Sequence, residues 1–264
     1  MGLCFGLGEW AEAGDVVRVG GTGSGSGALL ALAKAYERHH PDHSIQVLPS
    51  IGSTGGIRAV ADRKLDLGCI SRAMTKEEES LGLEAQSLAT TAFVFATSAH
   101  TAAGPLTLKE VEDIYAGRKA TWKDGRPIRL VLRPKSDTAH AYLSGFTPGM
   151  KATLDQAHAL PGVCVGITDQ EALTQLEQTP GSFGTAVLGL IVSEGRQVKA
   201  LPVDGIQPTS PDYPFTLTLR MVFRRSEWSA AAQSFMAFAQ SKEGRQILSQ
   251  AGYRPMAETS RGAR

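Results

Sequence analysis

Residues 18–36 read RVGGTGSGSGALLALAKAY, in which glycines and hydroxyl residues stand directly before a run with helical periodicity. Glycine lets the backbone approach a ligand closely, hydroxyls donate hydrogen bonds, and the first turn of a helix presents N–H groups with a partial positive charge. This combination suits a bound anion. A flexible connection between a strand and a helix is the alternative, and residues elsewhere in the chain must decide between them.

Two nucleotide-binding motifs fit this loop poorly. A P-loop requires Gly-Lys-Ser/Thr after the glycines, and the first lysine here is Lys34. The spacing of Gly23, Gly25 and Ala28 satisfies a loose dinucleotide pattern, but the following strand, SIQVLPS at 44–50, ends without the acidic residue that would bind a ribose. The loop therefore favours a simpler anion.

Strand and helix patterns alternate along the chain, which predicts an α/β fold with parallel sheets flanked by helices. Capping boxes of Thr and Glu at 75/78, 107/110 and 168/171 predict three helix starts. Loop-like stretches at 97–105 and 205–214 predict two crossings between lobes. We expect one lobe from residues 15–98 and 213–264, and a second lobe, 99–212, inserted between them. The predicted strands are 15–19, 44–50, 65–71, 88–98, 128–133, 162–167, 181–190 and 215–223, and the predicted helices include 27–40, 55–64 and those within 229–252.

Further hydroxyl and arginine residues follow other predicted strands. PSIGSTGGIRAV at 49–60 repeats the glycine and hydroxyl chemistry, ISRAM at 70–74 holds Ser71 and Arg72, and VLRPKSDTAHAYL at 131–143 holds Arg133. Carboxyl ends of parallel strands meet at one sheet edge, where open α/β sheets bind ligands. Guanidinium groups suit tetrahedral oxyanions. Each arginine alone is as consistent with a surface ion pair, and Ser136 with a helix N-cap.

These segments resemble the phosphate-binding proteins of bacterial phosphate ABC transporters. The likeness runs from about residue 15 to 255, through IGSTGGIRAVADRKLDLGCISRAMTKEE, LTLKEVEDIYAGRKATWKDGRPI, LRPKSDT, PGSFGTAV and YPFTLTLRMVF. The resemblance implies a two-lobed type II periplasmic-binding-protein fold that closes over phosphate or a related oxyanion. It also implies delivery to a membrane permease, a location in the periplasm or elsewhere outside the cytoplasm, and no catalysis. We expect a monomer without cofactor or metal.

The same resemblance implies a set of ligand-binding residues. These are Thr22, Ser24, Gly25, Ser26, Ser53, Thr54, Ser71, Arg72, Arg133, Ser136, Asp137 and Thr138. Asp137 departs from the family, which has glycine there. Either its carboxylate faces the cleft and accepts the proton of hydrogen phosphate, or it turns outward and interacts with the dipole of the next helix.

Composition narrows the remaining functions. Lys and Arg number 27 against 26 Asp and Glu, which indicates no nucleic-acid partner. Three cysteines show neither metal spacing nor a disulfide framework. Residues 1–14 suggest either a clipped or mis-started secretory signal or a disordered terminus. A receptor for another oxyanion, or for a small phosphorylated or carboxylated solute in transport or sensing, is the alternative function. An enzyme using Ser136, Asp137 and His140 is unlikely because no Gly-x-Ser-x-Gly motif is present.

Overall fold

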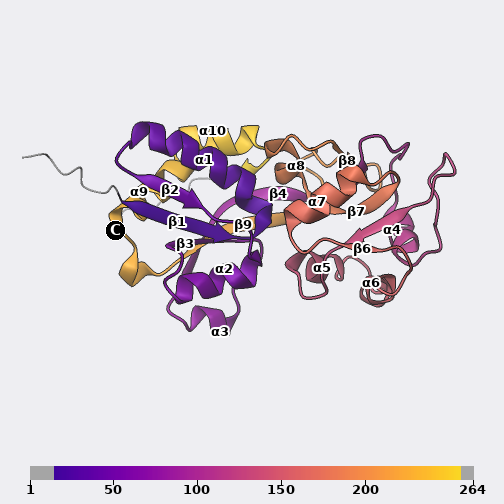
Figure 1. Cartoon of the computed structure of the whole chain (residues 1–264), viewed down its shortest axis with the longest axis horizontal. Coiled ribbons are helices and arrows are strands. Elements are labelled where there is room, and N and C mark those ends of the chain that lie inside the picture. The colour runs from indigo at the N-terminus through magenta and orange to yellow at the C-terminus, as the bar shows by residue number, and fades with distance from the viewer. Residues whose placement is uncertain (1–14, 257–264) are drawn as a thin grey trace, which may run out of the picture.

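The computed structural model describes residues 15–256, so Cys4 and the proposed secretory signal lie outside the described residues. In the first third of the chain, strands alternate with helices as the sequence predicts (Figure 1). The elements are β1 Val16–Gly21, the 3-10 turn η1 Gly23–Gly25, α1 Ser26–His39, β2 Ser44–Val47, α2 Gly52–Ala61, β3 Leu67–Ile70 and α3 Lys76–Glu79.

The middle of the chain repeats this alternation, and the last part returns to the first sheet. The middle elements are β4 Glu84–Ser98, α4 Leu108–Tyr115, β5 Arg129–Leu132, α5 Thr138–Leu143, α6 Met150–Ala157, β6 Cys164–Val165, α7 Asp169–Gln178, β7 Ser182–Val187, α8 Leu188–Ser193 and β8 Val198–Leu201. The last elements are β9 Thr216–Phe223, the 3-10 turn η2 Arg225–Glu227, α9 Ala230–Gln240, α10 Lys242–Gln250 and β10 Arg254–Pro255.

Local sequence signals account for many helix starts. All three predicted capping boxes form, at the N-termini of α3, α4 and α7, because each threonine accepts a backbone N–H while the glutamate three residues on bonds back. The segment 181–190, predicted as one strand, ends as β7 at Val187 and continues as α8. An apolar run of this kind carries no periodicity that separates a buried strand from a buried helix.

The strands form two sheets that share β4. In lobe I, β2, β1 and β3 are parallel neighbours, and β9 joins β3 to the first part of β4. In lobe II, β6, β5 and β7 are parallel neighbours, and the second part of β4 pairs with β7 and β8. In Figure 1, α1, α9 and α10 lie on one side of the lobe I sheet and α2 and α3 on the other.

The α/β two-lobed fold is thus confirmed, with more antiparallel pairing than the sequence suggested. Every printed pairing of β4 is antiparallel, with β7, β8, β9 and β10. The physical reason is that β4 runs from one lobe to the other while β9 returns beside it. β4 pairs with β9 through Ala92 and with β7 from Phe93 onward. The division at 98/99 and 212/213 stays a prediction.

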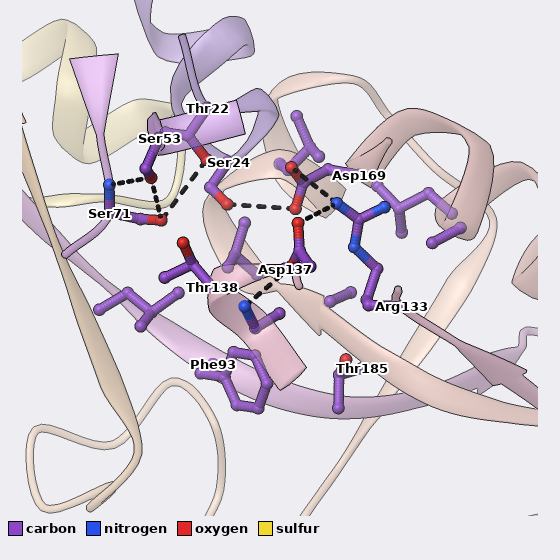
Figure 2. A pocket seen from close by; sticks show the side chains of 17 residues that line it. Thr22, Ser24, Ser53, Ser71, Phe93, Arg133, Asp137, Thr138, Asp169 and Thr185 are labelled. Atoms are coloured by element: carbon purple, nitrogen blue, oxygen red, sulfur yellow. Dashed lines mark hydrogen bonds and ion pairs between the residues drawn. The ribbon is translucent and has the colours of Figure 1, made fainter. Parts of the chain in front are cut away.

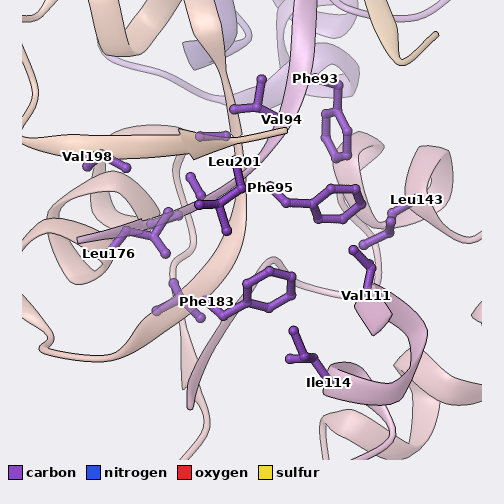
Figure 3. Close-up of a cluster of buried hydrophobic side chains, with 14 of the residues drawn as sticks. Phe93, Val94, Phe95, Val111, Ile114, Leu143, Leu176, Phe183, Val198 and Leu201 are labelled. Atoms are coloured by element: carbon purple, nitrogen blue, oxygen red, sulfur yellow. The ribbon is translucent and has the colours of Figure 1, made fainter. Parts of the chain in front are cut away.

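Each lobe has its own hydrophobic core. In lobe II, Phe95 of β4 stacks on Phe183 of β7 with ring centroids 5.9 Å apart, and both are fully buried (Figure 3). Phe93 belongs to the same cluster, at the point where β4 changes sheets. The two cores fix the sheet ends between which the site forms. No helix within residues 15–256 is long and apolar enough to cross a membrane.

Candidate functional site

A small cavity lies between the two lobes, where the strand ends of lobe I face β5, α5 and α7 (Figure 2). Its volume is about 20 Å³, a little more than one water molecule needs, so this space is small. Among the predicted site residues it is lined by Thr22, Ser24, Ser53, Ser71, Arg133, Asp137 and Thr138. Residues far apart in sequence therefore meet at the predicted sheet edge.

The lobe I wall is made of hydroxyls at strand ends. Thr22 follows β1, Ser71 follows β3, and Ser53 lies in the first turn of α2. The Ser71 N–H donates to Ser53 Oγ at 3.1 Å, and the Ser71 hydroxyl lies 3.3 Å from Ser53 Oγ and 3.5 Å from Thr22 Oγ1. All three are buried. Their hydroxyl hydrogens rotate freely, so this wall can turn donors toward an anion.

Close packing of backbone holds this wall together. Gly21 has a φ of +129°, and a Cβ there would collide with the Cys69 carbonyl oxygen. The Thr22 N–H donates to that same carbonyl at 2.8 Å, which fixes Thr22 beside the end of β3. Glycine is required at position 21 because an L side chain would force the two strand ends apart.

The lobe II wall carries charge. Arg133 follows β5, is 7% exposed, and donates from one terminal nitrogen to the Gly166 carbonyl at 2.6 Å. Its other terminal nitrogen lies 2.9 Å from Asp137 Oδ2 and 3.8 Å from Asp169 Oδ2. Within residues 15–256, Arg133 Nε is a buried donor without an acceptor. Because Arg133 lines the cavity, this Nε–H is a donor that a ligand there could satisfy.

Asp137 combines the two orientations that the sequence left open. As the N-cap of α5 it accepts the Ala139 N–H at 2.8 Å through Oδ1, and through Oδ2 it accepts from Arg133 while lining the cavity. The N-cap of α5 is thus Asp137 and not Ser136. In the enzyme alternative this carboxylate would orient His140, but among residues 15–256 its hydrogen bonds go to Arg133 and to the Ala139 N–H.

Asp169, the first residue of α7, lines the cavity and was missed by the sequence analysis. Its Oδ1 accepts from the Ser24 hydroxyl at 3.1 Å, across from the other lobe. Burial raises the pKa of Asp169, and the charge of Asp137 raises it further, while Arg133 and Ser24 lower it. The sequence contains one signal for Asp169, which is its position directly after Thr168, the N-cap of the predicted helix. An acidic residue in the first turn of a helix is common, so this position alone does not indicate a ligand site.

Five predicted residues do not line the cavity: Gly25, Ser26, Thr54, Arg72 and Ser136. The Ser26 hydroxyl donates to the Gly23 carbonyl and accepts from Gln170 Nε2 at 2.7 Å, so it joins the lobes beside the cavity. Gly25 packs against Cys69 Sγ, and Ser136 is exposed. Their role as ligand residues stays a prediction.

Arg72 is held outside the cavity by an ion pair. Both its terminal nitrogens donate to Glu78 at 2.7 Å, and one also donates to Thr54 Oγ1 at 3.0 Å. This bidentate pair lowers the pKa of Glu78. Arg72 thus braces α3 against α2, which is the surface ion-pair interpretation that the sequence left open.

Two histidines, His140 and His158, form a pair in lobe II. His140 lies beside His158, with ring centroids 5.4 Å apart, and burial lowers the pKa of both. Among residues 15–256, no group of three or more His, Cys, Asp or Glu side chains is arranged to hold a metal ion. Cys69 and Cys164 are free thiols, and burial raises the pKa of Cys69 to about 12.

Comparison with known proteins agrees with this architecture. The model of a family described as a PBP superfamily domain matches residues 9–243. The chain belongs to this superfamily. The two lobes that share β4, with a cavity between them, are therefore those of a PBP superfamily member.

Individual proteins resemble the chain in part of its sequence or in its fold. The phosphate-binding protein PstS 2 of Streptococcus pneumoniae serotype 4 is 31% identical over 102 residues, which are 39% of this chain and 34% of the relative. The match therefore spans about a third of the relative's length. A putative phosphate ABC transporter substrate-binding protein from Clostridium perfringens, solved with bound phosphate, has a TM-score of 0.79 at 22% identity, covering 92% of this chain and 100% of that one. An ABC-type phosphate transport receptor from Vibrio cholerae has a TM-score of 0.64 at 20% identity, covering 91% and 100%.

Proposed function

We propose that this protein binds inorganic phosphate between its lobes and delivers it to the membrane permease of an ABC importer, outside the cytoplasm and without catalysing a reaction. The observation that carries the proposal is the pairing of a hydroxyl wall with a buried arginine across a cavity of about 20 Å³. A small tetrahedral anion has oxygens in several directions, so donors converging from both lobes suit it.

The contacts give each wall a separate part in the proposed binding. Thr22, Ser53 and Ser71 would donate to anion oxygens from lobe I, and Arg133 would contribute its Nε–H from lobe II. Binding donors from both lobes would favour closure about the connecting strands, because the full set of hydrogen bonds exists only when the walls meet. The names of the phosphate-binding relatives support the same ligand.

A receptor for another anion is the second candidate. The observation behind it is that two carboxylates, Asp137 and Asp169, stand beside a single arginine in this cavity. Two ionised carboxylates oppose a multiply charged anion, which leaves a singly charged oxyanion or small carboxylate as a competitor for the site. The cavity volume limits the size of any such solute.

Calorimetry of the protein, after dialysis from denaturant and refolding, tests the proposal against a panel of phosphate, sulfate and acetate. We expect saturable one-to-one binding of phosphate, at least about ten-fold tighter than sulfate or acetate. Tighter binding of either competitor would favour the second candidate. Turnover of chromogenic esters or phosphate esters by the same sample would instead revive the enzyme alternative.

A further inference from the structure

The charges in the cavity do not balance. Asp137 and Asp169 both face the same terminal nitrogen of Arg133, at 2.9 Å and 3.8 Å. When all three groups are ionised, their sum is one negative charge. Asp137 already has a donor on each oxygen, whereas Asp169 sits farther from the guanidinium and reaches across to Ser24 (Figure 2).

Asp169 occupies donors that an incoming anion would use. The Ser24 hydroxyl lies on the lobe I wall and Arg133 on the lobe II wall, and the Asp169 carboxylate contacts both. An ionised carboxylate accepts but cannot donate, so it competes with an anion for these two groups and repels it through space. A protonated carboxyl group does neither, and its O–H can donate to an anion oxygen.

Building on the proposed function, we propose that Asp169 couples oxyanion binding to the uptake of one proton from solvent. The proton adds to one carboxylate oxygen of Asp169 as the anion enters, and no other bond is made or broken. The neutral carboxyl group then releases the guanidinium to the anion. Binding therefore weakens as the pH rises, at a pH where the anion itself no longer changes charge.

The surroundings of Asp169 agree with this coupling. Burial raises its pKa, and the nearby charge of Asp137 acts in the same direction, against Arg133. Cys69 and Tyr253 also face it, but burial raises the pKa of both, so they stay neutral near pH 7. Glu194 bonds to Gln170 and pairs with Arg196, next to this group and outside the cavity.

The test is calorimetric titration of the full chain with inorganic phosphate at about pH 8.5, in buffers of different ionisation enthalpy. At this pH phosphate is almost entirely the dianion, so proton uptake reports on the complex. We expect the wild type to take up about one proton per anion, with Kd rising about ten-fold per pH unit. Asp169→Asn should take up none and bind phosphate about ten-fold more tightly.

Asp155→Asn is the matched control, because Asp155 is an aspartate paired with Lys151 on α6, away from the cavity. It should leave the proton count and Kd unchanged. An Asp169→Asn protein that still takes up a proton, or that binds phosphate more weakly at this pH, overturns the coupling while leaving phosphate binding intact. Absence of phosphate binding in the wild type, the control and Asp169→Asn alike would instead refute the proposed function and the coupling with it.

Discussion

The two walls of the cavity are built on different physical principles. The lobe I wall consists of neutral hydroxyls fixed by backbone at the strand ends, with Ser53 bonded to the Ser71 N–H. The lobe II wall consists of Arg133 and two carboxylates, and burial raises the pKa of one of them, Asp169. Lobe I thus determines the shape of the cavity, and lobe II determines its charge. Substitutions on the two walls should therefore change the Kd for phosphate by different amounts and with different pH dependence.

Arg133→Ala, on the lobe II wall, should weaken phosphate binding more than any other substitution considered below. This change removes the cation and leaves Asp137 and Asp169 facing each other and any anion. Losing one partner of a buried charged contact costs about 2–5 kcal/mol, so phosphate should bind at least about 30-fold more weakly. Calorimetry measures the change, with Arg129→Ala as control, since Arg129 begins β5, the strand that Arg133 follows, and donates to the Pro180 carbonyl. An unchanged Kd would rule out the role of Arg133.

Contact between the walls is tested next by Gly23→Ala. A Cβ at this position would lie 2.7 Å from Asp169 Oδ2 and from Gln170 Oε1 and 3.0 Å from Asp169 Cβ, so these lobe II side chains must move before the lobes approach as closely. We expect phosphate binding to weaken about ten-fold, because closure then costs about 1.4 kcal/mol more. Gly104→Ala is the control, since nothing lies within 4 Å of a Cβ there. Equal Kd values for both variants would show that this contact does not limit closure.

The hydroxyl wall should respond less, through Ser53→Ala. The change removes one hydroxyl donor to the anion, at a cost of about 1 kcal/mol in the bound state, or about five-fold in Kd. It also leaves the buried Ser71 N–H without its acceptor in the free and bound states alike, which lowers the stability of the fold and not the affinity. The effect on Kd should be the same across neutral and alkaline pH, because no charge changes. Ser80→Ala, at a surface turn, provides the comparison. A loss of phosphate affinity in Ser53→Ala that depends strongly on pH would contradict the assignment of charge to the lobe II wall alone.

The smallest effect on binding is expected for Arg72→Ala, since Arg72 pairs with Glu78 outside the cavity. Phosphate affinity should change less than about two-fold. Because Arg72 lowers the pKa of Glu78, the pair stabilises the fold above the ordinary glutamate pKa and loses this effect as the pH falls through the lowered pKa. Thermal melts should therefore show the variant less stable at neutral pH, with the gap closing in acid. A ten-fold loss of affinity would restore Arg72 as a ligand residue.

Local signals and the superfamily resemblance together predicted most of the fold. The capping box of Thr168 and Glu171 fixed the start of α7, and the run at 88–98 predicted the strand that became β4. Prediction was weakest where an apolar run fits a buried strand and a buried helix equally well. The run at 181–190 was predicted as one strand but forms the strand β7 followed by the helix α8. The antiparallel pairing of β4 was also missed, because pairing partners are set by tertiary contacts and not by the strand's own residues.

The site was predicted unevenly, for physical reasons. Hydroxyls at strand ends, such as Ser71, follow from topology, because parallel strands bring their carboxyl ends to one edge. The carboxylate of Asp169 escaped notice because its partner Ser24 is 145 residues away in sequence. The resemblance implies Arg72 as a ligand residue, but its guanidinium pairs with Glu78 of α3 and does not line the cavity. Motif alignment identifies backbone position, and it does not show where a long side chain finds its partner.

The continuity of β4 has a consequence for folding. Its residues 84–92 pair with β9 in one sheet, and its residues 93–98 pair with β7 and β8 in the other. Cutting the chain within β4 would leave these lateral pairs in place but remove the continuous strand that couples the two sheets. The two lobes of the intact chain should accordingly unfold in a single cooperative transition. A lobe that shares a strand with its neighbour is therefore not an independent folding unit, and recombination should transfer the two lobes together.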